Sequence, residues 1–156
     1  MATRSTISIE LDDGVIKQVY CHWDGYLANN GKLLLEHYAD PIVAEELITQ
    51  GSISSLRETT GEQHSFDERY EATDARSKWT TFYGRDRGEE DAGYHMFKNF
   101  DEYKSDHQYE EYEYILRNDG LWYVCTNGAH GHGHYMLLID AIAEELRMRH
   151  LEEEDA

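Results

Sequence analysis

Carboxylates dominate the chemistry that this sequence offers. The chain has 156 residues, of which 32 are acidic and 14 basic, so the net charge is 14 − 32 = −18 with histidine neutral. Glu111 and Glu113 alternate along a predicted strand, which places them on one side about 6.6–6.8 Å apart at roughly 3.3–3.4 Å per residue. Two steps along one DNA strand cover a similar distance, because its phosphates are spaced at about 3.4 Å.

Other carboxylates lie close to this pair in the sequence. The set expected to form one anionic face is Asp101, Glu102, Asp106, Glu110, Glu111 and Glu113. Such a face would fit a basic nucleic-acid groove on another protein, where complementary charge speeds encounter and selects the partner. The alternative is that the negative charge only keeps the protein soluble. The two hypotheses differ in whether folding gathers the carboxylates or scatters them.

A histidine-glycine segment offers metal chemistry. His130, His132 and His134 alternate, so on an extended segment three imidazoles converge on a zinc, nickel or copper ion, and Cys125 lies close enough in sequence to add a thiolate. The interleaved glycines raise the entropy cost of organising such a site. The segment therefore predicts either a metal-dependent enzyme or a solvent loop that binds metal adventitiously.

Aromatic and arginine side chains offer a third kind of site. Trp23, Tyr26, Arg85 and Arg87 could hold a nucleotide-like molecule, since arginine binds phosphate bidentately and stacks on bases. In so acidic a chain the competing use of the two arginines is pairing with carboxylates such as Asp86 or Glu89. This ligand-binding module is our second functional hypothesis.

Cys21 and His22 are neighbours, a pairing that occurs in nucleophilic catalysis. Adjacent strand residues point to opposite faces, so the two side chains are badly placed to share a proton. Asp24 before Gly25 is typical of a tight turn. We therefore expect a structural motif in which Trp23, Tyr26 and Tyr38 pack around the turn. The sequence has no phosphate-loop, dinucleotide, nucleophile-elbow or His-Glu-x-x-His pattern.

Two hairpins and several helices are predicted to position these residues. Alternating apolar residues flank Asp-Gly turns over residues 7–22 and 112–125. Helices are expected over 32–38, 41–50 (capped by Asp40), 96–103 and 136–150, with a strand over 79–83 and a long loop over 57–78. The order predicts a single α+β domain over residues 1–151, with three to four helices on one face of an antiparallel sheet, and a frayed acidic tail over 152–156.

The amino-acid composition limits the kinds of partner that the protein is expected to bind. Protonating all nine histidines would leave the charge at −9, which argues against direct binding to nucleic acid or to an anionic membrane surface. Two cysteines cannot form a disulfide framework, and no apolar run approaches the roughly 20 residues that span a bilayer. Residues 1–5 lack the features of a signal peptide. These observations predict a cytoplasmic protein without a cofactor, and they leave its oligomeric state open.

Several motifs resemble a family of small acidic proteins encoded by tailed phages and prophages. They are Tyr20-Cys21-His22-Trp23-Asp24-Gly25-Tyr26 with Leu34-Leu35-Glu36-His37-Tyr38, the opening Ala2 to Ile7, Thr81 to Glu89, and Glu110 to Tyr114. The resemblance covers most of the chain, although the Gly128–His134 segment departs from the pattern. It implies phage origin and action in the host cytoplasm, but no established activity. With the acidic surface, it favours an inhibitor of host CRISPR or restriction complexes that mimics DNA and is not an enzyme.

Overall fold

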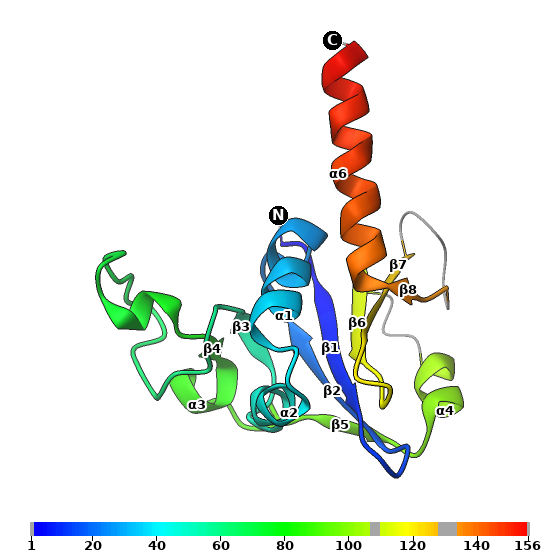
Figure 1. Cartoon of the computed structure of the whole chain (residues 1–156). Coiled ribbons are helices and arrows are strands. Elements are labelled where there is room, and N and C mark those ends of the chain that lie inside the picture. Colours follow the sequence, from blue (N-terminus) through cyan, green and yellow to red (C-terminus); the bar gives the residue numbers. More distant parts are fainter. Residues whose placement is uncertain (1, 107–109, 128–133, 156) are drawn as a thin grey trace.

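The centre of the structure is a pair of parallel strands that come from distant parts of the chain. In this computed structural model, β1 (Ser5–Glu10) pairs with β6 (Tyr112–Leu116), with Ile7 opposite Tyr114. Each strand is also one arm of an antiparallel hairpin, β1 with β2 (Ile16–Cys21) and β6 with β7 (Trp122–Thr126). Both predicted hairpins are confirmed, and Figure 1 shows them joined into one sheet. Residues 2–106, 110–127 and 134–155 are described.

Four short strands extend this sheet beyond the two hairpins. They are β3 (Ile53–Ser55), β4 (Thr81–Phe82), β5 (His95–Phe97) and β8 (Met136–Leu137). The strand order is β4-β3-β2-β1-β6-β7-β8, and β5 pairs with β2 off this path. Apart from the pairs β1–β6 and β2–β3, all of these ladders are antiparallel. The predicted α+β class is confirmed.

Helical segments cover both faces of the sheet. They are the π-helical turn η1 (Leu27–Gly31), α1 (Lys32–His37), α2 (Pro41–Thr49), the 3-10 turn η2 (Ala75–Lys78), α3 (Tyr83–Arg87), α4 (Phe100–Ser105) and α6 (Leu138–Asp155). The main core joins α1, α2 and the start of α6 to one face of the strands. Tyr103 of α4 packs with Ile16 and Ile115, which lie on the opposite face. The expectation that helices cover one face only is therefore wrong.

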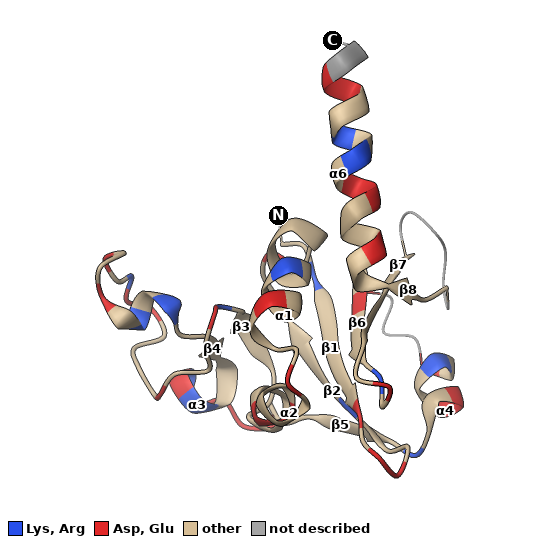
Figure 2. Cartoon of the chain, in the orientation of Figure 1, with Lys and Arg blue, Asp and Glu red and all other residues tan. Residues whose placement is uncertain are grey.

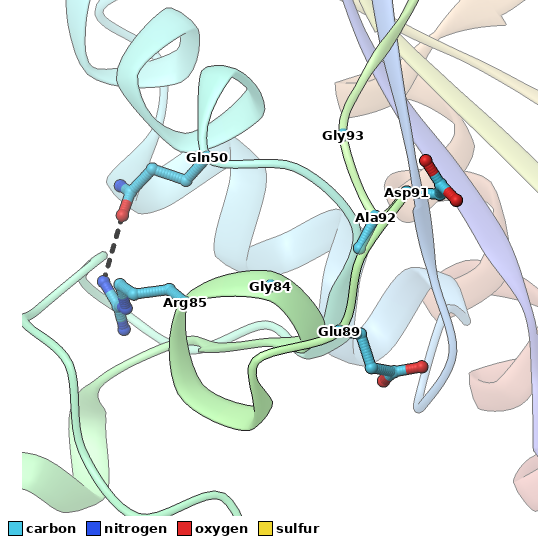
Figure 3. Close-up of a pocket in the computed structure, with 7 residues that line it drawn as sticks. All are labelled: Gln50, Gly84, Arg85, Glu89, Asp91, Ala92 and Gly93. Atoms are coloured by element: carbon cyan, nitrogen blue, oxygen red, sulfur yellow. Dashed lines mark hydrogen bonds between the residues drawn. The ribbon is translucent and has the colours of Figure 1, made fainter.

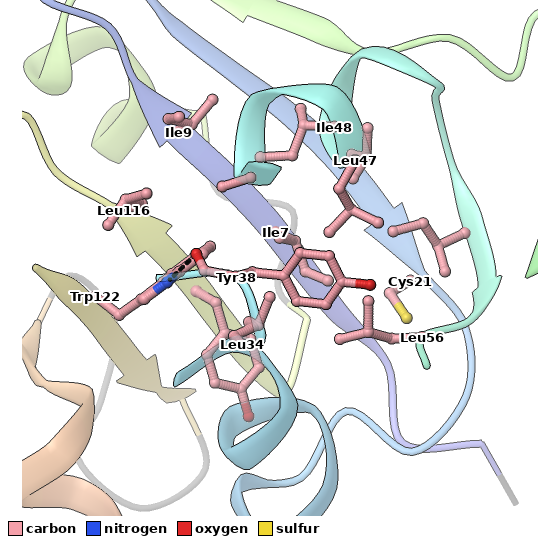
Figure 4. Close-up of a cluster of buried hydrophobic side chains, with 14 of the residues drawn as sticks. Ile7, Ile9, Cys21, Leu34, Tyr38, Leu47, Ile48, Leu56, Leu116 and Trp122 are labelled. Carbon is pink, nitrogen blue, oxygen red and sulfur yellow. Dashed lines mark hydrogen bonds between the residues drawn. The ribbon is translucent and has the colours of Figure 1, made fainter. Parts of the chain in front are cut away.

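The main core contains buried aromatic side chains whose polar atoms form hydrogen bonds with backbone carbonyls. Tyr38 is completely buried, and its hydroxyl donates a hydrogen bond to the Arg57 carbonyl at 2.7 Å. The indole of Trp122 donates to the Tyr38 carbonyl at 3.0 Å, as Figure 4 shows. Tyr114 reaches across to the Gly25 carbonyl at 2.6 Å. A buried polar atom without a partner would be costly, so these bonds fix how the aromatic rings pack.

Local signals account for some helix boundaries and not for others. The Asp40 carboxylate accepts a hydrogen bond from the amide of Ile42 at 2.9 Å and Pro41 opens α2, as predicted. The predicted helix over residues 96–103 is wrong in its first half, because residues 95–97 form β5 against β2. Helix α4 begins only at Phe100, where the Asn99 side chain caps it. The predicted strand over 79–83 likewise shortens to residues 81–82.

The last helix projects from the sheet. Residues 136–137, which were predicted to be helical, form β8 instead, and α6 runs from Leu138 to Asp155 through most of the segment assigned to an acidic tail. Figure 1 shows its C-terminal part standing clear of the other elements. Within the described residues, no helix combines the length and the apolar character needed to cross a bilayer.

Candidate functional site

The six carboxylates predicted to form one face do not share a surface. Glu113 lies on β6 and is only 2% exposed, so it cannot contact a partner as expected. Its carboxylate accepts hydrogen bonds from Asn127 Nδ2 at 2.7 Å and from the Tyr135 hydroxyl at 3.3 Å. Glu113 alternates with Tyr114 and shares the side of Ile115, which α4 covers. Glu111 is exposed but precedes the strand, so the expected Glu111–Glu113 repeat is not formed.

The remaining members of the set are divided between the two ends of β6. Glu110 is half-buried beside the start of the strand, where burial raises its pKa, Arg4 opposes that shift, and Glu111 adds to it. Asp101 and Glu102 lie in the first turn of α4, and Asp106 follows that helix; all three are exposed. The start of α4 lies near the other end of β6, because the ring of Phe100 is 3.6 Å from the guanidinium of Arg117.

Sequence reasoning missed that both hairpin turns meet at this second end. Strands β1 and β6 run parallel as neighbours, so the turns that follow them, Asp12-Asp13-Gly14 and Asn118-Asp119-Gly120, lie at the same edge of the sheet. Glu10 connects the two segments, since its carboxylate accepts hydrogen bonds from Arg117 Nε at 2.9 Å and from the Asn118 amide at 3.0 Å. Two acidic turns that are more than one hundred residues apart thereby become adjacent.

Helices α2 and α4 bring further carboxylates to the same edge. Residues 9–13 line a groove of about 500 Å³ together with Pro41, Ile42 and Glu45 of α2. We call the exposed carboxylates of this edge the acidic rim, which comprises Asp12, Asp13, Asp40, Asp101, Glu102 and Asp119. In Figure 2 the turns that follow β1 and β6, the start of α2 and helix α4 lie in the lower part of the molecule.

The charges of the acidic rim are largely uncompensated. Two nearby cations are engaged by carboxylates outside the rim, Lys17 by Glu45 at 3.4 Å and Arg117 by Glu10 at 2.9 Å. No rim carboxylate forms an ion pair within the described part of the chain. Lys98 precedes α4 and Lys104 lies in its last turn, and both moderate the field there. A hydrogen bond from the Tyr123 hydroxyl at 2.7 Å lowers the pKa of Asp119 and favours its ionised form.

The rest of the charge is unevenly distributed along the chain. Residues 57–87 hold six basic and seven acidic side chains, a net charge of −1, so the other residues carry −17. Figure 2 shows carboxylates on the helices, turns and loops of this remainder rather than on one surface. The acidic rim is therefore a local concentration of carboxylates in a protein that is negatively charged along most of its sequence. The segment 57–87 differs from the rest because its acidic and basic side chains nearly balance.

Arg85, one of the predicted ligand-binding residues, is instead used internally. Its guanidinium donates hydrogen bonds to the carbonyls of Thr80 and Thr60 at 2.8 and 2.7 Å, and it pairs with the completely buried side chain of Asp86 at 3.0 Å. Figure 3 shows its further hydrogen bond to Gln50. The competing expectation of intramolecular pairing is confirmed here, and the other arginine, Arg87, lies 3.8 Å from Glu89.

The Asp86 carboxylate organises the loop around it. It accepts hydrogen bonds from the amides of Phe82 at 2.8 Å and His64 at 3.1 Å, and the His64 ring lies 3.5 Å away. The side chain of His64 is only 4% exposed and packs edge-on against Trp79. We call Arg85, Asp86 and His64 the loop node. It stabilises a segment that has few apolar residues of its own.

Next to the loop node lies a cleft of about 620 Å³ that we call the loop cleft. Its lining is aromatic and charged, and comprises Trp23, Asp24, Ser54, Ser55, Arg57, His64, Phe66, Asp67, Glu68, Arg69, Tyr70, Arg76, Ser77, Trp79 and Thr81. Tyr26, Arg85 and Arg87 do not line it, so the predicted four-residue site is not formed. Trp23 and Tyr26 are 43% and 40% exposed and do not pack around the turn as expected. Asp24 does adopt a turn conformation, with a φ of 55°.

The two cysteine and histidine motifs show no assembled reactive site. Cys21 is buried and accepts a hydrogen bond from Asn30 Nδ2 at 3.3 Å, whereas His22 contacts the Tyr20 hydroxyl at 2.6 Å, so they are not a reactive pair. Burial raises the pKa of the Cys21 thiol to about 11. His130 and His132 lie outside the described residues, and His134 is exposed. Where the structure is described, no three His, Cys, Asp or Glu residues are grouped to hold a metal.

Comparison with known proteins adds no further constraint. No family model matches the chain, and searches of curated proteins and of solved structures find no match.

Proposed function

We propose that this protein binds a cationic groove of a partner protein through the acidic rim, and so blocks a nucleic-acid-processing complex of a bacterial host. The observation that carries the proposal is the convergence of both Asp-Gly turns at one edge of the sheet, with the nearby Arg117 and Lys17 already paired. Uncompensated carboxylates on short, hydrogen-bonded turns form a fixed array of negative charge. Such an array complements a surface that evolved to hold phosphates.

The turns favour this role because their carboxylates are held in place. Asp13 accepts a hydrogen bond from the Val15 amide at 3.1 Å, and Asp119 accepts one from the Leu121 amide at 2.9 Å. These bonds reduce the conformational entropy that the side chains would lose on binding. The inhibitor hypothesis thus keeps Asp101 and Glu102 of the predicted face and gains Asp40 and the two turns. It no longer includes Asp106, Glu110, Glu111 and Glu113.

The test is a binding titration against purified CRISPR effector and restriction complexes over a salt series. Affinity should fall steeply as salt screens the rim. The triple variant Asp12→Asn/Asp13→Asn/Asp119→Asn should weaken binding by at least tenfold, because asparagine can retain the turn hydrogen bonds while removing the charge. The matched control is Glu36→Gln/Glu152→Gln/Glu153→Gln, which removes the same charge from exposed positions on α1 and α6.

The comparison of these two variants separates a specific face from general acidity. If both variants weaken binding equally, only the net charge of the protein matters, and the acidic rim is not the binding surface. Affinity that does not change with salt would reject electrostatic binding altogether.

The loop cleft supports a second candidate function, the binding of an aromatic ligand that carries an anionic group, such as a nucleotide. The specific observation is that Arg57 and Arg69 line an aromatic cleft, and neither forms an ion pair within the described residues. Trp23 and Trp79 offer rings for stacking, and the volume of about 620 Å³ is in the range of small-molecule sites. Arg76 also lines the cleft, but it forms an ion pair with Asp74 at 2.7 Å, so we do not assign it to the binding of the anionic group.

Mass spectrometry of molecules released from protein purified from infected cells tests this candidate. A retained nucleotide should disappear in the variant Arg57→Gln/Arg69→Gln and persist in the control Arg147→Gln, since Arg147 is an exposed arginine on α6. Purified protein that carries no small molecule, and whose Tm does not change with added nucleotides, would contradict it.

A further inference from the structure

Helix α6 exposes an apolar surface that nothing in the described part of the chain covers. Its first turn packs into the core through Leu138 and Ala141, which are 0% and 4% exposed. Ile139, on the outer side of the same turn, and Leu146 further along the helix are 59% and 60% exposed. Figure 1 shows the helix extending away from the sheet, and no described helix or strand lies along its outer half. Most helix stability in proteins comes from the packing of an apolar face, and the outer part of α6 has no such packing in the described structure.

Three exposed apolar residues of α6, followed by a histidine, have a coiled-coil spacing. Ile139, Ala143, Leu146 and His150 are separated by four, three and four residues, and all four are exposed. This spacing places them in one stripe along the helix, at the a and d positions of a heptad. Met148 and Leu151 are also exposed, but they lie on another side of the helix.

We propose that α6 pairs with α6 of a second copy of this chain as an antiparallel two-helix coiled coil. In the register that is symmetric about residues 144 and 145, Ile139 packs against His150 of the second copy. Ala143 packs against Leu146 of the second copy, and the same two layers repeat by symmetry. The small alanine side chain lies opposite the large leucine in each central layer, so the helices approach closely without a void.

Charge complementarity favours the antiparallel orientation. At the e positions that flank this seam, Asp140 of one copy lies beside Arg147 of the other, and two-fold symmetry makes this pair twice. Arg149 already forms an ion pair with Glu145 on its own helix at 2.8 Å, which leaves Arg147 for the partner. A parallel pair would instead place His150 against its own copy and Arg147 beside Ile142, with no opposite charge. The antiparallel arrangement also keeps the two sheets at opposite ends of the paired helices.

Sedimentation equilibrium of the full chain over a range of concentrations tests this inference. The wild type should approach twice the monomer mass of 18.2 kDa. Leu146→Glu should remain monomeric, and its circular dichroism should stay native because Leu146 is exposed. The control Met148→Glu changes another exposed residue of α6 that lies outside the stripe, and should dimerise like the wild type.

A charge exchange tests the orientation. Arg147→Glu should weaken the dimer roughly tenfold, since it replaces two symmetric exposed pairs with like charges, and Asp140→Arg/Arg147→Glu should restore it. A wild type that stays monomeric at every concentration would overturn the proposal. If Leu146→Glu still dimerises, or if Met148→Glu does not, the stripe is not the surface through which the two helices pair. Failure of the double variant to restore affinity would overturn the antiparallel register.

Discussion

Arg85 and Asp86 show how an acidic chain uses a few of its cations inside the fold. Asp86 has no exposed side-chain surface, and burying a charge is costly unless it is paired and hydrogen-bonded. Two backbone amides, one guanidinium and the His64 ring surround its carboxylate. The guanidinium in turn binds three carbonyls and the Gln50 amide oxygen. The pair therefore connects the start of α3 to the loop before it, and its role is structural.

Removal of one partner of this pair should be strongly destabilising. Arg85→Gln should lower the free energy of unfolding by about 3–5 kcal/mol, because it leaves the buried Asp86 carboxylate without its cation. The control is Arg87→Gln. The Arg87 side chain is 56% exposed and its ion pair with Glu89 is long, at 3.8 Å, so this variant should lose less than about 1 kcal/mol of the free energy of unfolding. Urea unfolding monitored by tryptophan fluorescence measures both. Equal losses in the two variants would contradict the structural role of Arg85.

The segment from residue 57 to residue 80 depends on close packing at a single glycine. Gly61 has a φ of +60°, and a Cβ atom there would lie 2.2 Å from Cγ of Trp79. The loop amide of Thr59 also donates to the Lys78 carbonyl at 3.0 Å, and the Thr80 amide donates back to the Thr59 carbonyl at 2.8 Å. Long loops without regular structure are uncommon in small domains unless they serve a purpose. These contacts give the loop cleft its shape.

Gly61→Ala should therefore distort the loop as well as strain it. We expect a loss of about 2–4 kcal/mol in the free energy of unfolding and a shift of Trp79 fluorescence, since both the left-handed conformation and the steric clash oppose the methyl group. Gly88→Ala is the matched control: it has a φ of +77° but no atom within 4 Å of the added Cβ. It should cost only about 1 kcal/mol, the strain alone. A Gly61→Ala loss no larger than that of Gly88→Ala would contradict this packing.

At the level of elements, the sequence is informative where a pattern is local. The hairpins over 7–22 and 112–125 follow from alternation and Asp-Gly turns, and α2 follows from Asp40 and Pro41. The pairing of β1 with β6 could not be predicted, because no local pattern states which strands are neighbours. That pairing, and α4 on the second face of the sheet, decide which carboxylates are exposed. For this reason the acidic turns were missed and Glu113 was wrongly assigned to the surface.

At the scale of the whole molecule, buried phenols and thiols make stability sensitive to high pH. Burial raises the pKa of Tyr38 from 10.0 to about 12 and that of Cys21 from 9.0 to about 11, and it also raises the pKa of Tyr103 and Tyr114. The unfolded chain releases these protons near pH 9–10, whereas the folded chain retains them. The stabilisation is therefore complete below about pH 9 and is lost as the pH rises towards 12.

Urea unfolding at pH 8, 9, 10 and 11 should show the free energy falling with each step above pH 9, by about 2 kcal/mol or more in total. Tyr38→Phe should be less stable at pH 8, because the hydrogen bond to the Arg57 carbonyl is lost, but its decline above pH 9 should be shallower. The exposed tyrosine Tyr26 gives the control: Tyr26→Phe should decline as the wild type does. Stability that stays constant from pH 8 to pH 11 would contradict this account.

The parallel ladder between β1 and β6 also governs how the chain can acquire its structure. Residues 5–9 pair with residues 112–116, so the central ladder cannot form until residue 116 has been synthesised. The first hairpin must wait with one edge open, and the high contact order predicts slow folding. Open strand edges invite aggregation, but the nascent segment carries a surplus of negative charge that opposes self-association. The same negative charge that would attract a cationic partner thus protects the unfinished protein on the ribosome by repelling other copies of the chain.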